Sequence, residues 1–250
     1  MYLRNPLALI SAALVFVLAG CASAPEQGSP AMLAAYRATL SNPEALQPAP
    51  NQPGAYRWLA PNANLGRYDK VLFDRIAVRL DDKAEYKSVD PVALAQLVEY
   101  FRQALVKALT PQYPVVDQAG PGVLRVRITI VDVVPNDVAV SMGVTAIAGP
   151  VATMLISEAT GEPKGAAPYL GRTGITVAVI DSQTNRVIGE YADTRFGQQY
   201  VLDLNKGVTG MVEANATSFY SSMSKWSYVD QAFDGWAKLF RQRLDQAHGR

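Results

Sequence analysis

The chain has 250 residues, of which 49% are apolar and 18% charged, and its 23 basic and 22 acidic residues leave a formal net charge of +1. This length and apolar content suffice for one folded domain and exclude a fibrous or wholly disordered protein. A nearly neutral chain gives no basis for a nucleic-acid partner, because binding to phosphates requires a basic surface. One cysteine and one histidine argue against disulfide scaffolds, zinc sites and thiol–imidazole catalysis. We therefore expect no metal and no cofactor.

Residues 1–20 have the pattern of a bacterial signal peptide. Arg4 supplies a positive charge, and the uncharged stretch 6–19 follows it. This stretch is shorter than the roughly twenty apolar residues that span a bilayer. We expect the segment to direct export and to be removed.

The end of this segment is more specific. Leu18-Ala19-Gly20-Cys21 resembles the lipobox of bacterial lipoproteins. The resemblance implies that a signal peptidase recognises Leu18, Ala19 and Gly20, and that Cys21 becomes an N-terminus carrying fatty acyl chains such as palmitate. Two or more chains anchor a protein stably. No aspartate follows the cysteine, so the expected location is the inner leaflet of the outer membrane, facing the periplasm. The alternative is an ordinary signal peptide with a chance cysteine.

Residues 21–64 are expected to form the lipidated cysteine and a proline-rich tether. Proline disfavours long regular elements, and seven prolines recur in this segment. A short helix is predicted over residues 32–40, where apolar residues repeat at three- and four-residue steps. Tyr56, Trp58 and Leu59 could dock the end of the tether onto the domain.

Residues 65–250 are expected to form a single periplasmic domain. Alternating or continuous apolar patterns predict strands at 70–80, 113–117, 124–130, 174–181 and 186–196. Apolar stripes predict helices from Asp90-Pro91 to Thr110-Pro111 and across 229–244. The order predicts a two-layer α/β sandwich with one mixed sheet of four to five strands and amphipathic helices mainly on one face.

Residues 138–156 are apolar and carry no charge, and they interrupt the regular order of elements. The segment contains two glycines and a proline, which favour two short pieces over a membrane span. One interpretation is a buried helical insertion. The other is a surface that contacts the membrane or a partner, or that mediates oligomerisation. Candidate contact residues are Val138, Met142, Ile147 and Met154, together with the late aromatic residues Trp226 and Tyr228.

A catalytic set is hard to assemble from this sequence. His248 lies two residues from the C-terminus, where chains usually fray. Two clusters of acidic residues remain as candidates for carboxylate catalysis. The first contains Asp81, Asp82 and Glu85, after the first predicted strand, and the second contains Asp132 and Asp137, near another strand end. Asp181 is more simply a turn-stabilising side chain.

The chain resembles the DUF3313 family of bacterial lipoproteins, a domain of unknown function. The resemblance rests on residues 32–40, on Tyr68-Asp69-Lys70-Val71-Leu72, on residues 174–181, and on Lys225-Trp226 ahead of Trp236. It implies no catalytic residues.

The leading hypothesis is therefore a non-enzymatic outer-membrane lipoprotein whose periplasmic domain binds an envelope protein or peptidoglycan. The first alternative is a carboxylate-dependent envelope hydrolase acting on glycans. The second is a membrane-contacting or oligomerising role for residues 138–156. The oligomeric state does not follow from the sequence.

Overall fold

The computed structural model describes residues 30–80, 89–138, 170–197 and 225–250. Their main feature is one mixed seven-stranded sheet with the order β1-β2-β7-β6-β5-β3, to which β4 adds by pairing with β5. The strands are β1 (Gln47–Pro48), β2 (Tyr56–Leu59), β3 (Lys70–Phe73), β4 (Ala77–Val78), β5 (Val123–Val134), β6 (Arg172–Asp181) and β7 (Val187–Phe196). The α/β class and the mixed sheet predicted from the sequence are confirmed.

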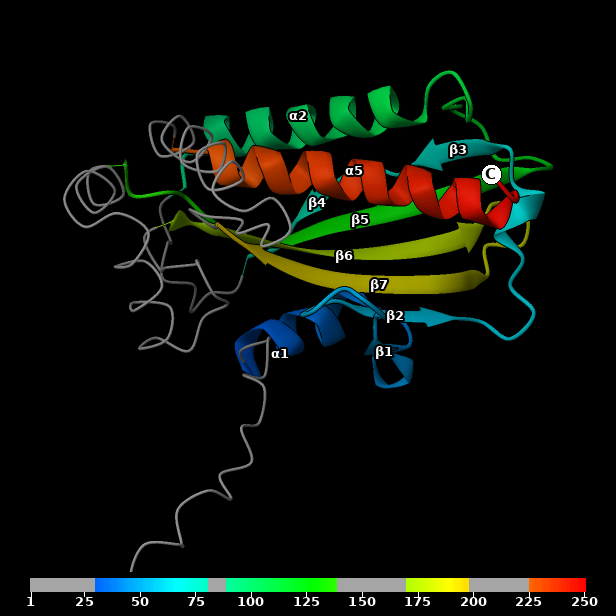
Figure 1. Cartoon of the computed structure of the whole chain (residues 1–250), viewed down its shortest axis with the longest axis horizontal. Helices are drawn as coiled ribbons and strands as arrows, with labels where there is room; N and C mark the ends of the chain where they lie inside the picture. Colours follow the sequence, from blue (N-terminus) through cyan, green and yellow to red (C-terminus); the bar gives the residue numbers. More distant parts are fainter. Residues whose placement is uncertain (1–29, 81–88, 139–169, 198–224) are drawn as a thin grey trace, which may run out of the picture.

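Two long helices cover one face of this sheet (Figure 1). They are α2 (Pro91–Leu109) and α5 (Ser227–Ala247). The predicted start of α2 is confirmed, since the Asp90 side chain accepts a hydrogen bond from the Val92 amide at 3.1 Å. The helices meet through the rings of Phe101 and Phe233, which stack with their centroids 4.3 Å apart. The main core lies between these helices and the sheet.

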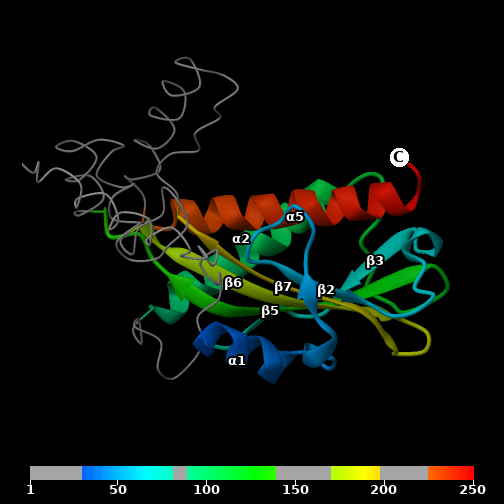
Figure 2. The same cartoon turned by 60° about the horizontal axis from the view of Figure 1, so that its bottom comes forward.

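A third helix, α1 (Pro30–Thr39), lies against the opposite face (Figure 2). Tyr36 is its anchor: the side chain is 2% exposed and packs with Val131 and Ala192 of the sheet. The predicted short helix in this region is confirmed. Short 3-10 helices η1 (Pro43–Ala45) and η2 (Leu65–Arg67) lie in the connections that follow.

The folded part of the chain begins earlier than the tether prediction allowed. Strands β1 and β2 lie inside the segment 21–64, and β2 pairs antiparallel with β7 over four residues. Proline does not prevent this, because Pro48 lies in the edge strand β1, where a missing amide hydrogen costs no ladder bond. Residues 30–64 therefore belong to the domain, and the docking predicted for Tyr56, Trp58 and Leu59 takes the form of a sheet strand.

The predicted strand 70–80 is also corrected, since it is two short strands, β3 and β4, both parallel to β5. The break falls at Asp74, whose carboxylate binds Arg125 at 2.7 Å and Arg127 at 3.2 Å. The strand predicted at 113–117 is reduced to a single bridge between Val115 and Val71. Short edge strands explain why the sheet has seven strands instead of four or five.

Candidate functional site

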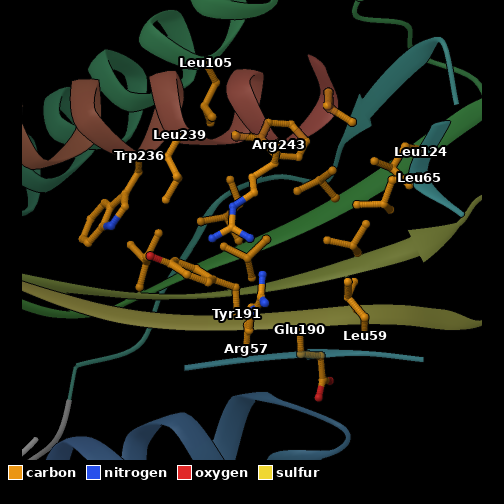
Figure 3. Close-up of a pocket in the computed structure, with 18 of the residues that line it drawn as sticks. Arg57, Leu59, Leu65, Leu105, Leu124, Glu190, Tyr191, Trp236, Leu239 and Arg243 are labelled. Carbon is orange, nitrogen blue, oxygen red and sulfur yellow. The ribbon is translucent and has the colours of Figure 1, made fainter. Parts of the chain in front are cut away.

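A cavity of about 130 Å³ lies between the helix layer and the sheet (Figure 3). Its floor is formed by β5, β6 and β7, its roof by α2 and α5, and one side by β2 and η2. The lining is almost entirely carbon, with a small number of polar groups at one side. This combination is typical of small-molecule sites.

The apolar floor follows from strand alternation. Leu124, Val126 and Ile128 of β5 face the cavity, and Val177 and Val179 of β6 lie in the neighbouring rows. Side chains at every second position of a strand share one face. The alternation recognised in the sequence thus builds the floor.

The roof follows from helical spacing. Trp236, Leu239, Phe240, Arg243 and Leu244 of α5 all line the cavity. Residues three or four apart lie on one side of a helix. Arg243 is the only charged residue in this stripe, and that placement is what gives the cavity a polar side.

A second arginine comes from the sheet. Arg57 of β2 stands directly opposite Tyr191 of β7 in the antiparallel register, so the two side chains share the face that the helices cover. Figure 3 shows the guanidinium groups of Arg57 and Arg243 directed toward each other beside Tyr191. Gln52 Oε1 accepts a hydrogen bond from Arg243 Nη2 at 3.2 Å.

The surroundings of Arg57 and Arg243 disfavour a positive charge on Arg243. Burial lowers the pKa of Arg243, and the neighbouring charge of Arg57 lowers it further. Burial raises the pKa of Tyr191 well above its usual range, as does the negative charge of Asp193. Tyr191 is therefore a neutral hydrogen-bond donor at physiological pH.

The two carboxylates closest in sequence to Tyr191 are already engaged elsewhere. Asp193 Oδ2 accepts from Trp236 Nε1 at 2.6 Å and from the Tyr191 hydroxyl at 2.9 Å. Glu190 is directed away from the cavity (Figure 3), and its two oxygens accept from the amides of Ser41 and Asn42 at 2.6 and 2.8 Å. Both acids serve the fold, because buried carboxylates need such donors.

The predicted contact residues are only partly described. Val138 is half-buried at the edge of the described residues, and Met142, Ile147 and Met154 lie outside them. Trp226 is half-buried and packs against the main core. Tyr228, in the first turn of α5, is 8% exposed, so its side chain is buried and is not an exposed contact.

The predicted anchor also lies outside the described residues, as do Cys21 and the preceding Leu18, Ala19 and Gly20. Among the described residues, no helix has both the length and the apolar character required to cross a bilayer.

The candidate catalytic acids do not converge where they can be placed. Asp81, Asp82 and Glu85 lie outside the described residues. Asp132 is buried and pairs with Arg172 at 2.6 Å, whereas Asp137 is exposed. No group of three or more potential metal ligands occurs among the residues described.

Two further predictions can be judged at the residue level. Asp181 does stabilise its turn, since Oδ1 accepts from the amides of Gln183 at 3.2 Å and Thr184 at 2.9 Å. His248 Nδ1 lies 2.8 Å from the Leu244 carbonyl oxygen, within the last turn of α5. Leu244 lines the cavity, but His248 itself is not among the described residues of the lining.

Sequence reasoning missed the two arginines. A signal existed for Arg243, which is a charged residue on the apolar stripe of a helix, seven residues after Trp236. Arg57 had no comparable signal, because β2 is four residues long and lies in a proline-rich segment.

Comparison with known proteins gives a family but no activity. A family model described as "Protein of unknown function (DUF3313)" matches residues 35–216. No curated protein matches the chain. Solved structures with weak likeness include a PelC dodecamer from Paraburkholderia phytofirmans, at 11% identity and a TM-score of 0.31, with 68% of this chain and 98% of that chain covered. A DUF330 protein from Xanthomonas campestris has 12% identity and a TM-score of 0.33, with 80% of this chain and 94% of that chain covered. A DUF4136 protein from Bacteroides thetaiotaomicron has 12% identity and a TM-score of 0.28, with 68% of this chain and 97% of that chain covered. Likeness at this level supports no functional conclusion.

Proposed function

We propose that this chain, which belongs to the DUF3313 family of proteins of unknown function, is a non-enzymatic envelope lipoprotein that binds an apolar group of an envelope component. The binding site is the cavity between α5 and the sheet. Anchoring is through acylated Cys21 on the periplasmic face of the outer membrane.

The cavity is the observation that carries this proposal. An apolar pocket of about 130 Å³ that opens to solvent leaves hydrocarbon surface in contact with water, which costs stability. A chain selected only to fold would gain by filling the space with larger side chains. Cavities kept at such a cost are expected at functional sites.

The lining favours an apolar group over a sugar. Apolar cavities of about 150 Å³ take up molecules the size of benzene. A sugar would require several hydrogen-bonding partners along the cavity wall, and the floor strands supply Val and Ile side chains instead. The expected ligand part is therefore a short hydrocarbon or an aromatic ring.

The anchor supports an envelope location for this binding. Eight residues, 22–29, separate Cys21 from Pro30, the first residue of α1. Their full extension spans at most about 30 Å. An acylated Cys21 would hold the domain close to the membrane surface, within reach of membrane components.

The test is binding of a small neutral apolar ligand to the full mature chain, which begins at residue 21 and carries C21S to keep acyl chains out of solution. We expect 1-hexanol to bind with millimolar or better affinity, measured by a protein NMR titration. The substitution L239W fills the cavity from α5 and should abolish binding. The control V92W places the same side chain on α2, where Val92 is 63% exposed, and should leave binding unchanged.

Loss of binding counts only if the thermal unfolding midpoint of L239W stays near that of the V92W protein. Equal 1-hexanol affinity of the L239W and V92W proteins would contradict the proposal. Failure of the protein with an unaltered cavity to bind 1-hexanol would contradict it as well.

A further inference from the structure

We infer that the ligand is an anionic amphiphile, in which a short apolar part enters the cavity and a carboxylate or phosphate group is bound by Arg57 and Arg243. This inference rests on the proposed function and names the chemistry of its ligand.

The geometry brings two guanidinium groups to one side of an apolar cavity. Arg57 is fixed by the β2–β7 register opposite Tyr191, and Arg243 by its place in the α5 stripe. Both side chains are half-buried, and they come from different layers of the fold (Figure 3). An anion between them would contact both arginines while its apolar part remained inside.

The described residues provide no carboxylate for either group. Other buried or half-buried arginines pair with acids, as Arg172 does with Asp132 and Arg241 with Asp245. Arg243 has the neutral Gln52 oxygen as its acceptor, and none of the described carboxylates forms an ion pair with Arg57 or Arg243. Two half-buried like charges that face each other are costly, and a bound anion would relieve that cost.

The nearest acids are unavailable for this task. The Glu190 carboxylate lies on the opposite face of the sheet and holds two backbone amides. Asp193 accepts from Trp236 and Tyr191, and it pairs with Arg195 at 3.3 Å. The negative charge that complements the two arginines is therefore assigned to the ligand.

Arginine suits this role for a chemical reason. Its planar fork binds carboxylate and phosphate oxygens through two parallel hydrogen bonds, and such charge-assisted bonds are about twice as strong as neutral ones. The cavity volume of about 130 Å³ limits the enclosed part to about the size of benzene. Six-carbon amphiphiles are therefore suitable probes.

The experiment compares four probes with one six-carbon chain: hexanoate, hexyl phosphate, 1-hexanol and hexylamine. Each is titrated into the mature chain carrying C21S and followed by protein NMR. At least one anion should bind about tenfold more tightly than 1-hexanol, and hexylamine more weakly than 1-hexanol. The tighter of the two anions identifies the head group as carboxylate or phosphate.

Variants assign the preference to the two arginines. R57Q and R243Q should each reduce anion affinity at least fivefold and leave 1-hexanol affinity within a factor of two. The control R37Q changes an arginine whose side chain is 62% exposed on α1, and it should alter neither value. The comparison of the four probes on unaltered arginines does not depend on how the variants fold.

The outcomes separate the two proposals. Binding of 1-hexanol with no preference for either anion would overturn the anionic ligand and leave the apolar cavity site standing. Failure of all four probes to bind would overturn both. An anion preference that survives in the R57Q and R243Q proteins would also contradict the assignment.

Discussion

Glu190 shows how one buried side chain fastens the N-terminal part of the domain. Its carboxylate is 3% exposed and accepts from the Ser41 and Asn42 amides. In E190Q only one terminal atom can accept, so one amide faces an NH₂ group. We expect a loss of about 2 kcal/mol in the free energy of unfolding, measured by urea denaturation.

The matched control is E44Q. Glu44 pairs with Arg37 at 3.4 Å at the surface, and its side chain is 79% exposed, so its loss should cost under about 1 kcal/mol. Equal stability of the E190Q and E44Q proteins would show that the Glu190 contacts do not form in solution.

Asp181 gives the domain an acid-sensitive turn. The Thr184 amide, and then the Tyr68 hydroxyl, hold the pKa of Asp181 at about 2. An unfolded aspartate titrates at about 3.9, so this carboxylate contributes up to about 2 kcal/mol above pH 4, and the contribution is lost as the pH falls toward 2. The stability difference between the unaltered protein and D181N should therefore shrink by up to this amount between pH 6 and pH 2.

Urea denaturation at several pH values measures this difference. Between pH 6 and pH 8 the difference in unfolding free energy between the unaltered protein and D181N should stay constant, because the Asp181 carboxylate is charged in both the folded and unfolded states. A gap equally large at pH 2 would contradict the low pKa.

Residue-level prediction from sequence succeeded where a side chain acts on its own neighbours. The Asp90 cap and the Asp181 turn depend on residues two or three positions away, so the local pattern contains the information. The proximity of Arg57 and Arg243 in the cavity depends on the pairing of β2 with β7 and on which side of α5 faces the sheet. No local pattern contains that information.

At the scale of elements, α1 is the part whose role differs most from expectation. Tyr36 is buried against the sheet, and its hydroxyl hydrogen-bonds to Thr194. Removing this ring in Y36A should cost about 3 kcal/mol and speed amide exchange in α1. Hydrogen exchange of residues 34–39 is the measurement, with R37A as the control on the exposed side of the same helix.

If the amide hydrogens of residues 34–39 exchange rapidly in the unaltered protein, and at the same rate in Y36A, α1 belongs to the tether and not to the domain. Slow exchange that is lost in Y36A would confirm that the domain includes α1.

The long elements were predictable because their patterns repeat several times. Helices α2 and α5 have 19 and 21 residues, and β5, β6 and β7 have 10 to 12 each. The strands β1, β2 and β4 have two to four residues, which is too short for alternation to register. They are defined by their pairing partners, which for β2 and β4 lie far away in the sequence.

At the scale of the whole molecule, the proposed anchor sets where the domain works. C21S should shift the chain from the membrane fraction to the soluble fraction and abolish labelling with radioactive palmitate, because Cys21 is the only cysteine. The control S23A keeps the lipobox and should remain in the membrane fraction. Unchanged fractionation of C21S would contradict anchoring through this residue.

The role of residues 138–156 and the hydrolase alternative stay predictions, since most of the relevant side chains lie outside the described residues. The residues that the structure describes around the cavity come from the sheet and from both long helices.

The most direct test of the central claim is to locate a bound six-carbon anion by intermolecular NMR contacts. The terminal methyl group of hexanoate or hexyl phosphate should contact the methyl groups of Val177 and Leu239, while the carbon next to the head group contacts Arg243. Contacts found only at other surfaces of the protein, or with the ligand reversed so that its head group lies against Val177, would contradict it.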